Sequence, residues 1–499
     1  MQASGGGQED CLYLHVHVPE RVANGSVAGP VPVMVYIHGG GLMDGGGQFE
    51  HLGPLAAHLG PDGVVVVAIN YRLNIFGWLA VAELSAESPT RTSGNYGLLD
   101  QQLALRWVEA NVGSFGGDPS RVTVAGQSSG GTSIFALLCS PASRGLFHGA
   151  IALSGSINVS MSLAAGHAQN APVVEAAGCA RSQGGGATAA ERLACLRALP
   201  ASALVAAIPN AWNTPGMWGL ELLNQSGMAY QGLPVVDGVV ITHSFRDALA
   251  AGLVDVPLMF GNMEFESDLG PDVDVSSFNQ AQWQAHLNES VASWDTSFPD
   301  IGADLYAAYE NASISDPDKA YTAFNTDYGL TCGSAAIAIG AKSGEYKSPI
   351  YLFVGKWSPE TPIPGSGRFV SYAYHTWDYQ CACEAWADAA NGGDWVPGSR
   401  DLAYSKALRG WWFDLMDDGQ LNEQTGSKGL NSGDVDDSGE AGLWASVEAA
   451  VGFPAHWNTF VMAPPGSIEG GSKGVVDFKG GICADLSAWG FDDRFWWCN

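Results

Sequence analysis

Two adjacent serines stand between glycines in the segment GQSSGG at residues 126–131, a composition that could supply a nucleophilic hydroxyl group. The segment lies between a Val-rich run, RVTVAG, and an apolar stretch, GTSIFALLCS, which we interpret as a strand and a helix. A serine nucleophile on a tight strand-to-helix turn has the pattern G-x-S-x-G. Only Ser128 fits it, because Gly126 and Gly130 lie two residues away on either side. The segment therefore predicts a nucleophile at Ser128.

A second glycine-rich segment, IHGGG at residues 37–41, follows another Val-rich run and lies upstream of the serine. Successive glycines can present backbone N–H groups to a developing oxyanion with no side chain in the way. The residue after a nucleophilic serine commonly donates its N–H to the same oxyanion. We therefore expect an oxyanion hole formed by the N–H groups of Gly40, Gly41 and Ser129. Because that role needs only backbone, the side chain of Ser129 is expected to be dispensable.

Alternating strands and helices are expected to position these segments. Five apolar runs are typical of strands buried on both faces of a parallel sheet; they span residues 31–40, 62–71, 121–126, 256–261 and 349–355. Between two of them, residues 98–112 predict an amphipathic helix whose apolar face carries Leu99, Leu103 and Trp107. This alternation predicts an α/β fold, with a mostly parallel twisted sheet and helices on both faces.

Composition excludes several other classes of protein. The 499 residues are 46% hydrophobic, which is ordinary for a globular chain, and the net charge of −29 disfavours nucleic-acid binding. No apolar run is long enough to span a membrane, and the first residues lack the features of a signal peptide. Without internal repeats or a Pro-rich linker, residues 1–499 are expected to form a single domain, with 462–499 as a Gly/Trp-rich tail.

Several motifs resemble the type-B carboxylesterase family, relatives of the cholinesterases, within the α/β-hydrolase fold. The motifs are EDCLYLHVHVP (9–19), HGGG (38–41), NYRL (70–73), GNYGLLDQQLAL (94–105), FGGDP (115–119), GQSSGG (126–131) and GLFHGAIALSGS (145–156). The resemblance implies a serine hydrolase that cleaves small-molecule carboxylic esters through an acyl-enzyme, without a metal ion or other cofactor. It leaves the acyl and alcohol groups of the ester open.

The resemblance places the acid of the catalytic triad five residues after Gly261, at Glu266. The family usually has glycine at the next position, where this chain has Ser267. Glu264 is the nearest alternative and Asp268 a more distant one. All three carboxylates could instead belong to a solvated acidic loop.

The triad base must follow the acid in the chain, and His286, His375 and His456 do so. His375 lies in SYAYHTWDYQ, which resembles the family's histidine loop, including an aspartate at Asp378. His286 lies in a helical pattern and is expected at the surface, whereas His456 lies near the end of the family resemblance. The predicted triad is therefore Ser128, Glu266 and His375.

The nine cysteines favour an oxidising compartment. Cys179 and Cys195 bracket a Gly/Ala-rich stretch and are predicted to form a disulfide. The resemblance also implies a Cys332–Cys483 pair, and it implies an upstream segment, absent here, that would supply a partner for Cys11. Cys11 is therefore expected to be unpaired and the first strands of the sheet to be truncated. Pairing stays open for Cys332, Cys381, Cys383, Cys483 and Cys498, and the spacing of Cys381 and Cys383 does not suit zinc.

Five N-x-S/T sequons also favour the secretory pathway; they lie at Asn24, Asn158, Asn224, Asn288 and Asn311. The chain is interpreted as a fragment of a secreted esterase, and its oligomeric state stays open. Some relatives of the family are binding or adhesion proteins that lack the catalytic residues. A non-catalytic binding protein and an inactive truncated esterase are therefore the alternatives to an active enzyme.

Overall fold

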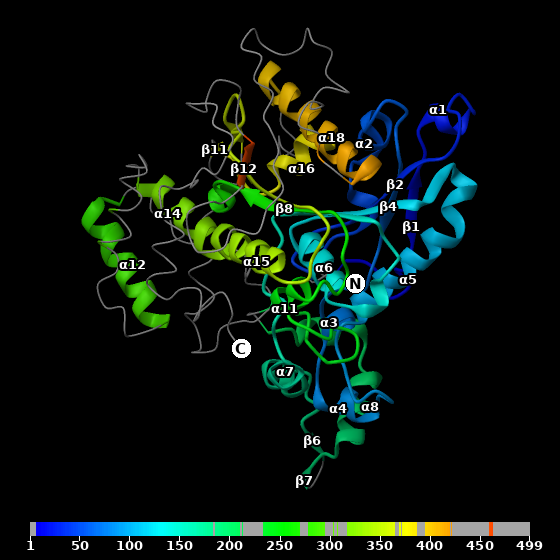
Figure 1. The fold of residues 1–499 in the computed structure, drawn as a ribbon. Helices are drawn as coiled ribbons and strands as arrows, with labels where there is room; N and C mark the ends of the chain where they lie inside the picture. Colours follow the sequence, from blue (N-terminus) through cyan, green and yellow to red (C-terminus); the bar gives the residue numbers. More distant parts are fainter. Residues whose placement is uncertain are drawn as a thin grey trace.

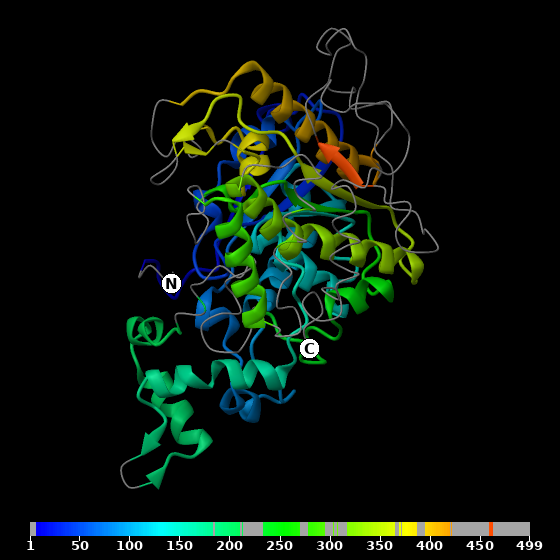
Figure 2. The same cartoon turned by 90° about the vertical axis from the view of Figure 1, so that its left-hand side faces the viewer.

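The computed structural model describes residues 6–182, 185–209, 212, 233–269, 278–294, 303, 307, 317–364, 369–370, 372–386, 395–419, 421 and 459–462. A central eight-stranded sheet has helices on both sides (Figures 1 and 2). Its spatial order is β1 (Leu14–His17), β3 (Val65–Ile69), β2 (Val31–Ile37), β4 (Gly117–Gln127), β5 (Gly149–Leu153), β8 (Leu258–Met263), β9 (Ile350–Gly355) and β12 (Thr459–Met462). Only β1 runs antiparallel to its neighbour among these strands. The predicted α/β-hydrolase fold is confirmed.

Side chains alternate between the two faces of the sheet and build a separate core on each. From β2, Met34 and Tyr36 enter one core, whereas Val33 and Val35 enter the other. The first core is completed by α2 (Leu52–His58), α14 (Pro317–Thr326), α16 (Trp377–Ala382) and α18 (Ser399–Asp418). The second is completed by α3 (Asn74–Trp78), α5 (Tyr96–Asn111), α6 (Ser129–Leu138), α7 (Leu163–Ala176), α11 (Phe245–Ala250) and α15 (Cys332–Ser343). Burial on both faces explains why β2 and β3 are nearly continuous apolar runs.

The helix predicted at residues 98–112 is α5, but its buried face differs from the predicted one. Leu99 is 40% exposed and Leu103 is 59% exposed. The buried face instead includes Gln101 and Gln102. Their amides donate to serine hydroxyls, Gln101 Nε2 to Ser133 Oγ at 3.0 Å and Gln102 Nε2 to two others. Hydrogen bonding makes these glutamines acceptable in the core, which the apolar pattern alone could not indicate.

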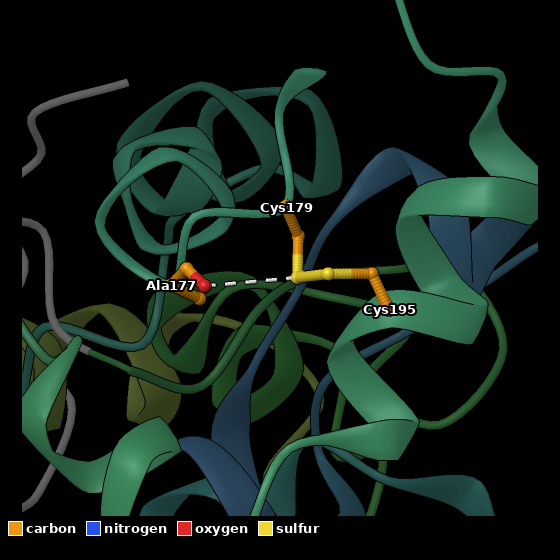
Figure 3. The surroundings of a disulfide bond; sticks show 3 residues. All are labelled: Ala177, Cys179 and Cys195. Atoms are coloured by element: carbon orange, nitrogen blue, oxygen red, sulfur yellow. Dashed lines mark hydrogen bonds between the residues drawn. A yellow bond between two sulfur atoms is a disulfide. The ribbon is translucent and has the colours of Figure 1, made fainter. Parts of the chain in front are cut away.

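The predicted Cys179–Cys195 disulfide is confirmed (Figure 3). It joins the segment after α7 to α8 (Ala189–Ala198), with Cα atoms 5.7 Å apart. These helices and the short strands β6 (Arg181–Ser182) and β7 (Gly185–Gly186) lie at the end of the molecule opposite α18 (Figures 1 and 2). The disulfide therefore stabilises a peripheral part of the fold.

The other predictions about cysteines and the C-terminal tail fall only partly on residues that the structure describes. Cys332 is disulfide-bonded, but Cys483 and Cys498 lie outside the described residues, so the Cys332–Cys483 pairing stays a prediction. The 462–499 tail also lies outside them, apart from its first residue. Within the described part of the chain, Cys11, Cys139, Cys381 and Cys383 carry free thiols. No helix in that part has the length and apolarity to cross a bilayer.

The edge of the sheet formed by β1 exposes apolar surface. Leu12 and Tyr13, which lead into this strand, are 48% and 53% exposed.

Four further α-helices complete the description, and one of them, α12, adds Trp283 to the first core. They are α1 (Glu20–Ala23), α4 (Ala82–Glu87), α9 (Ala201–Ala206) and α12 (Gln280–Trp294).

Candidate active site

Ser128 lies on the turn between β4 and α6 with φ 60° and ψ −129°. A positive φ is unusual for a residue other than glycine and marks a strained turn. The positions two residues before and after Ser128 require glycine, because a Cβ added at Gly130 would lie 2.1 Å from the Ile37 carbonyl oxygen. A Cβ at Gly126 would lie 2.7 Å from the carbonyl carbon of Gly130. This turn has the geometry of a nucleophile elbow.

His375 and Glu266 meet in the interior, where His375 is 5% and Glu266 1% exposed. Nδ1 of His375 lies 2.5 Å from Oε2 of Glu266, and the His375 N–H donates to the Glu266 carbonyl oxygen at 3.2 Å. The other carboxylate oxygen, Oε1, accepts from the Ser154 hydroxyl at 2.7 Å and from the Met263 N–H at 2.6 Å. The carboxylate is thus fixed on both sides, which can orient the imidazole and favour one tautomer.

The two alternative acids contact other groups. The Glu264 carboxylate lies 3.9 Å from Nζ of Lys356. Oδ2 of Asp268 accepts from the Tyr372 N–H at 2.9 Å and so holds the segment that leads to the histidine. Asp268 is 2% exposed, and Glu266 is buried as well, so the expectation of a solvated acidic loop is wrong. The cause is that these carboxylates accept hydrogen bonds from the fold itself.

The His375 ring contacts the elbow at Gln127, the residue before Ser128. Nε2 of Gln127 is 3.1 Å from Nε2 of His375. Thr376, which follows the histidine, has φ 76° and begins the turn into α16. The loop after β8, the turn after β4 and the segment before α16 therefore bring the three predicted triad residues into one region.

A second carboxyl group, that of Asp378, is fully buried near this pair. Its Oδ1 accepts from the Tyr379 N–H at 2.8 Å, and Oδ2 has no hydrogen-bond partner among the described residues. Burial, with a smaller effect of the Glu266 charge, raises the pKa of Asp378 to about 7. Asp378 can therefore change its charge near neutral pH.

The glycine-rich loop after β2 lies directly against the elbow. A Cβ added at Gly39 would be 3.0 Å from Cβ of Ser128, and one at Gly40 would be 2.2 Å from the Asp44 carbonyl oxygen. Gly40 and Gly41 have φ of 104° and 66°, which favours glycine. The loop curls because the N–H groups of Met43 and Asp44 both donate to the Gly40 carbonyl at 3.0 Å.

His38 at the start of this loop is 1% exposed and stacks on the Tyr71 ring, with centroids 4.5 Å apart. Burial lowers the pKa of His38 to about 4, so its imidazole is neutral at neutral pH. Its Nδ1 lies 2.8 Å from the Gly39 carbonyl oxygen, which makes Nδ1 the protonated nitrogen. This histidine therefore belongs to the support of the loop.

A pocket of about 280 Å³ opens beside the loop and the histidine. Its lining combines backbone of the glycine loop, polar groups next to the triad and aromatic rings; the residues are Tyr36, Gly39, Gly40, Gly45, Phe49, Glu50, Gln127, Thr376, Tyr379 and Gln380. The Tyr379 hydroxyl donates to the Glu50 carboxylate. The pocket could hold one part of a small organic substrate, with a carboxylate at its wall.

Several supporting residues were not predicted from the sequence. Ser154, which holds Glu266, follows β5 with φ 50°. Thr326 accepts the Glu266 N–H at its hydroxyl at 3.0 Å. Ser154 could have been suspected from its position directly after a buried strand. The C-terminal ends of neighbouring parallel strands meet at one edge of the sheet, so residues that follow them lie close together. Thr326 lies in another part of the chain and carries no comparable signal.

The other histidines after Glu266 do not reach this region or lie outside the described residues. His286 is half-buried in α12, where its ring packs against Phe278 and Tyr321. His456 lies outside the described residues. No group of three or more His, Cys, Asp or Glu in the described part of the chain is arranged to hold a metal ion.

Burial raises the pKa of the Cys381 and Cys383 thiols.

Comparison with known proteins identifies relatives of this site and fold. Residues 1–425 match the family model described as "Carboxylesterase family". Fumonisin B1 esterase of Sphingopyxis macrogoltabida is 47% identical over 148 residues, 30% of this chain and 26% of that enzyme. Carboxylesterase 1D of Rattus norvegicus is 37% identical over 244 residues, 48% of this chain and 40% of that enzyme. Cocaine esterase of Homo sapiens is 48% identical over 147 residues, 30% of this chain and 24% of that enzyme.

The chain thus matches less than half the length of each of these relatives. Among solved structures, PNB esterase superposes with a TM-score of 0.63 and 25% identity, covering 91% of this chain and 81% of that chain. The match to the family model extends over the elbow, the glycine loop and the Glu266–His375 pair. The chain belongs to the carboxylesterase family.

Proposed function

We propose that this protein is a serine hydrolase that cleaves carboxylic esters through an acyl-enzyme intermediate. The observation that carries the proposal is the buried Glu266–His375 contact beside the strained turn at Ser128. Named esterases among the relatives support the same class of reaction.

A serine hydroxyl is a weak nucleophile at neutral pH and needs a base. In the proposed mechanism, His375 takes the proton of Ser128 as its Oγ attacks the ester carbonyl carbon. Glu266 holds Nδ1–H and stabilises the imidazolium that forms. The C–O bond to the alcohol then breaks, and His375 donates the proton to the leaving oxygen. Water repeats these steps on the acyl-enzyme and releases the acid.

The negative charge that develops on the carbonyl oxygen must be stabilised by preorganised donors. The N–H groups of Gly40, Gly41 and Ser129 are proposed for this role. The close packing of the glycine loop against the elbow supports it, because loop and nucleophile can then act on one carbonyl group. Removing one such donor typically lowers turnover by about 10²–10³.

The substrate is proposed to be a small-molecule ester, with one of its parts in the pocket beside the glycine loop. The relatives are named for unlike substrates, fumonisin B1 and cocaine among them. The Glu50 carboxylate in the pocket wall and the net charge of −29 favour neutral or cationic esters over anionic ones.

The Cys179–Cys195 disulfide supports a location in an oxidising compartment, and the secretory pathway is proposed on that ground. Asn24 of one sequon lies in an exposed turn after α1, where a glycan could be attached.

Hydrolysis of a series of p-nitrophenyl esters, from acetate to decanoate, tests the proposal. The wild-type chain is expected to release p-nitrophenol from at least one ester, and Ser128→Ala should lower this rate by about 10³ or more. A wild-type rate equal to that of Ser128→Ala on every ester would contradict the proposal and favour a non-catalytic binding protein.

A further inference from the structure

We propose that the side-chain hydroxyl of Ser129 positions the oxyanion loop for catalysis. This inference rests on the proposed ester hydrolysis and adds a second task to Ser129, whose backbone N–H is already proposed as an oxyanion donor. The hydroxyl acts through Leu42 and does not touch the substrate, so it is a positioning group.

The contact joins two segments that are far apart in the sequence. Oγ of Ser129 accepts a hydrogen bond from the Leu42 N–H at 3.0 Å. Ser129 is 6% and Leu42 4% exposed, so no bulk water can replace this bond without rearrangement. Leu42 directly follows Gly41, and the hydrogen bond therefore fixes the end of the loop whose N–H groups should face the oxyanion.

Leu42 needs such a restraint because its backbone is strained. Its φ is 61°, a conformation that is rare for a bulky residue other than glycine. Such conformations persist only where surrounding contacts hold them. Leu42 is held at both polar groups of its backbone: Ser129 accepts its N–H, and its carbonyl accepts the Asn74 N–H at 2.8 Å.

The beginning of the loop is held by the same cluster of hydroxyl groups. The Tyr71 hydroxyl donates to the His38 carbonyl oxygen at 2.8 Å. The hydroxyl groups of Ser129 and Ser133 also act on this tyrosine and partly offset the rise in the pKa of Tyr71 that burial causes. Ser129 thus links the residue after the three glycines to the tyrosine that holds the residue before them.

Replacing Ser129 by alanine keeps its backbone N–H but leaves the buried Leu42 N–H without this acceptor. A buried donor without a partner is costly, so the loop is expected to rotate toward another acceptor or water. Small displacements of groups aligned with a transition state can lower rates by up to about 10²-fold. The prediction that the Ser129 side chain is dispensable, made from the motif alone, is therefore replaced.

Three variants test the hydroxyl: Ser129→Ala, Ser129→Thr, which keeps the hydroxyl, and Ser140→Ala as the matched control. Ser140 is also buried and accepts an amide hydrogen bond, from Gln102 at 2.8 Å, but it lies beyond the other end of α6. For each we would measure kcat and KM on the best p-nitrophenyl ester, the affinity for a trifluoromethyl ketone and thermal stability. The ketone forms a tetrahedral adduct whose oxyanion needs the same donors.

Ser129→Ala is expected to lower kcat about 10- to 100-fold, with KM within about twofold, and to weaken ketone binding by a similar factor. Ser129→Thr should recover most of kcat. Ser140→Ala should keep wild-type kcat even if its melting temperature falls as much as that of Ser129→Ala.

Wild-type kcat and ketone affinity in Ser129→Ala would overturn the inference while leaving the proposed function intact. Equal losses of kcat in Ser129→Ala and Ser140→Ala would also overturn it, because they would indicate a merely structural effect. Absence of hydrolysis and of ketone binding in the wild-type chain would overturn the proposed function, and this inference with it.

Discussion

Nδ1 of His375 lies 2.5 Å from Oε2 of Glu266, and both side chains are buried. Two further donors, the Ser154 hydroxyl and the Met263 N–H, hold the other carboxylate oxygen. A carboxylate fixed in this way can fix the imidazole in turn, which is the property a triad base needs.

Glu266 and Glu264 are expected to differ in their importance for turnover. Glu266→Gln is expected to lower kcat by about 10²–10⁴ because the amide cannot stabilise the imidazolium in the same way. Glu264→Gln should change kcat less than about threefold, since that carboxylate lies toward Lys356 and outside any proposed step. Steady-state kinetics on one ester measures both effects. The reverse order would assign the acid to Glu264.

Stability should depend on pH through Asp378. Its pKa is raised from 3.8 to about 7 by folding, so the native state binds the proton more tightly than the unfolded state. The stability linked to this group is therefore greatest below pH 4, falls as the pH rises to 7 and is constant above. Asp378→Asn should remove this loss. The free energy of unfolding of the variant should therefore exceed that of the wild type by an amount that grows to about 4 kcal/mol by pH 8.

Urea unfolding of the Asp378→Asn variant and the wild type, at several pH values from 4 to 8.5, measures this difference. Asp118→Asn provides a control of opposite sign, because hydrogen bonds from Ser120 hold the pKa of Asp118 below its ordinary value. That variant should lose a little stability at neutral pH and none at low pH. A pH-independent advantage of Asp378→Asn would contradict the assignment.

The face of α5 can be tested with polar and small substitutions. Leu103 is 59% exposed, so Leu103→Gln should change the free energy of unfolding by less than about 0.5 kcal/mol. Leu105 is fully buried, and Leu105→Ala should cost about 2–5 kcal/mol. Denaturant titration compares the two. Equal costs would mean that the helix is rotated toward the face expected from its apolar residues.

Charge selectivity is predicted from the pocket beside the glycine loop. A p-nitrophenyl ester with a terminal carboxylate should have kcat/KM about tenfold below that of an uncharged ester of equal length, because the carboxylate would lie near Glu50. Glu50→Gln should reduce this ratio of kcat/KM for the uncharged ester to kcat/KM for the anionic ester. Glu109→Gln removes the same charge at an exposed position of α5 and should leave the ratio unchanged. A ratio that responds equally to both variants would indicate an effect of net charge alone.

The sequence contains enough information for the central strands and the elbow because their patterns are local. Val65–Ile69 and Val33–Ile37 are buried on both faces, and this alone produces nearly continuous apolar runs. Ser128 was identifiable because Gly126 and Gly130 lie where any Cβ would clash. These features depend on a few neighbouring residues, so they can be predicted without the fold.

Features that depend on distant contacts could not be predicted in the same way. Gln101 and Gln102 are buried because serines on other segments accept their hydrogen bonds. The contact between Ser129 and Leu42 joins residues 87 positions apart. The contact of the His286 ring with Tyr321 also joins segments that are distant in the sequence.

The nucleophile itself provides the most direct test of the whole account. The wild-type chain would be treated with a fluorophosphonate, and the adduct located by mass spectrometry of the intact protein and its peptides. We predict one phosphonyl group per chain, on Ser128, with labelling abolished in Ser128→Ala and retained in Ser140→Ala. A wild-type chain that stays unlabelled, or a label on Ser129 or another residue, would contradict the assignment of Ser128 as the nucleophile.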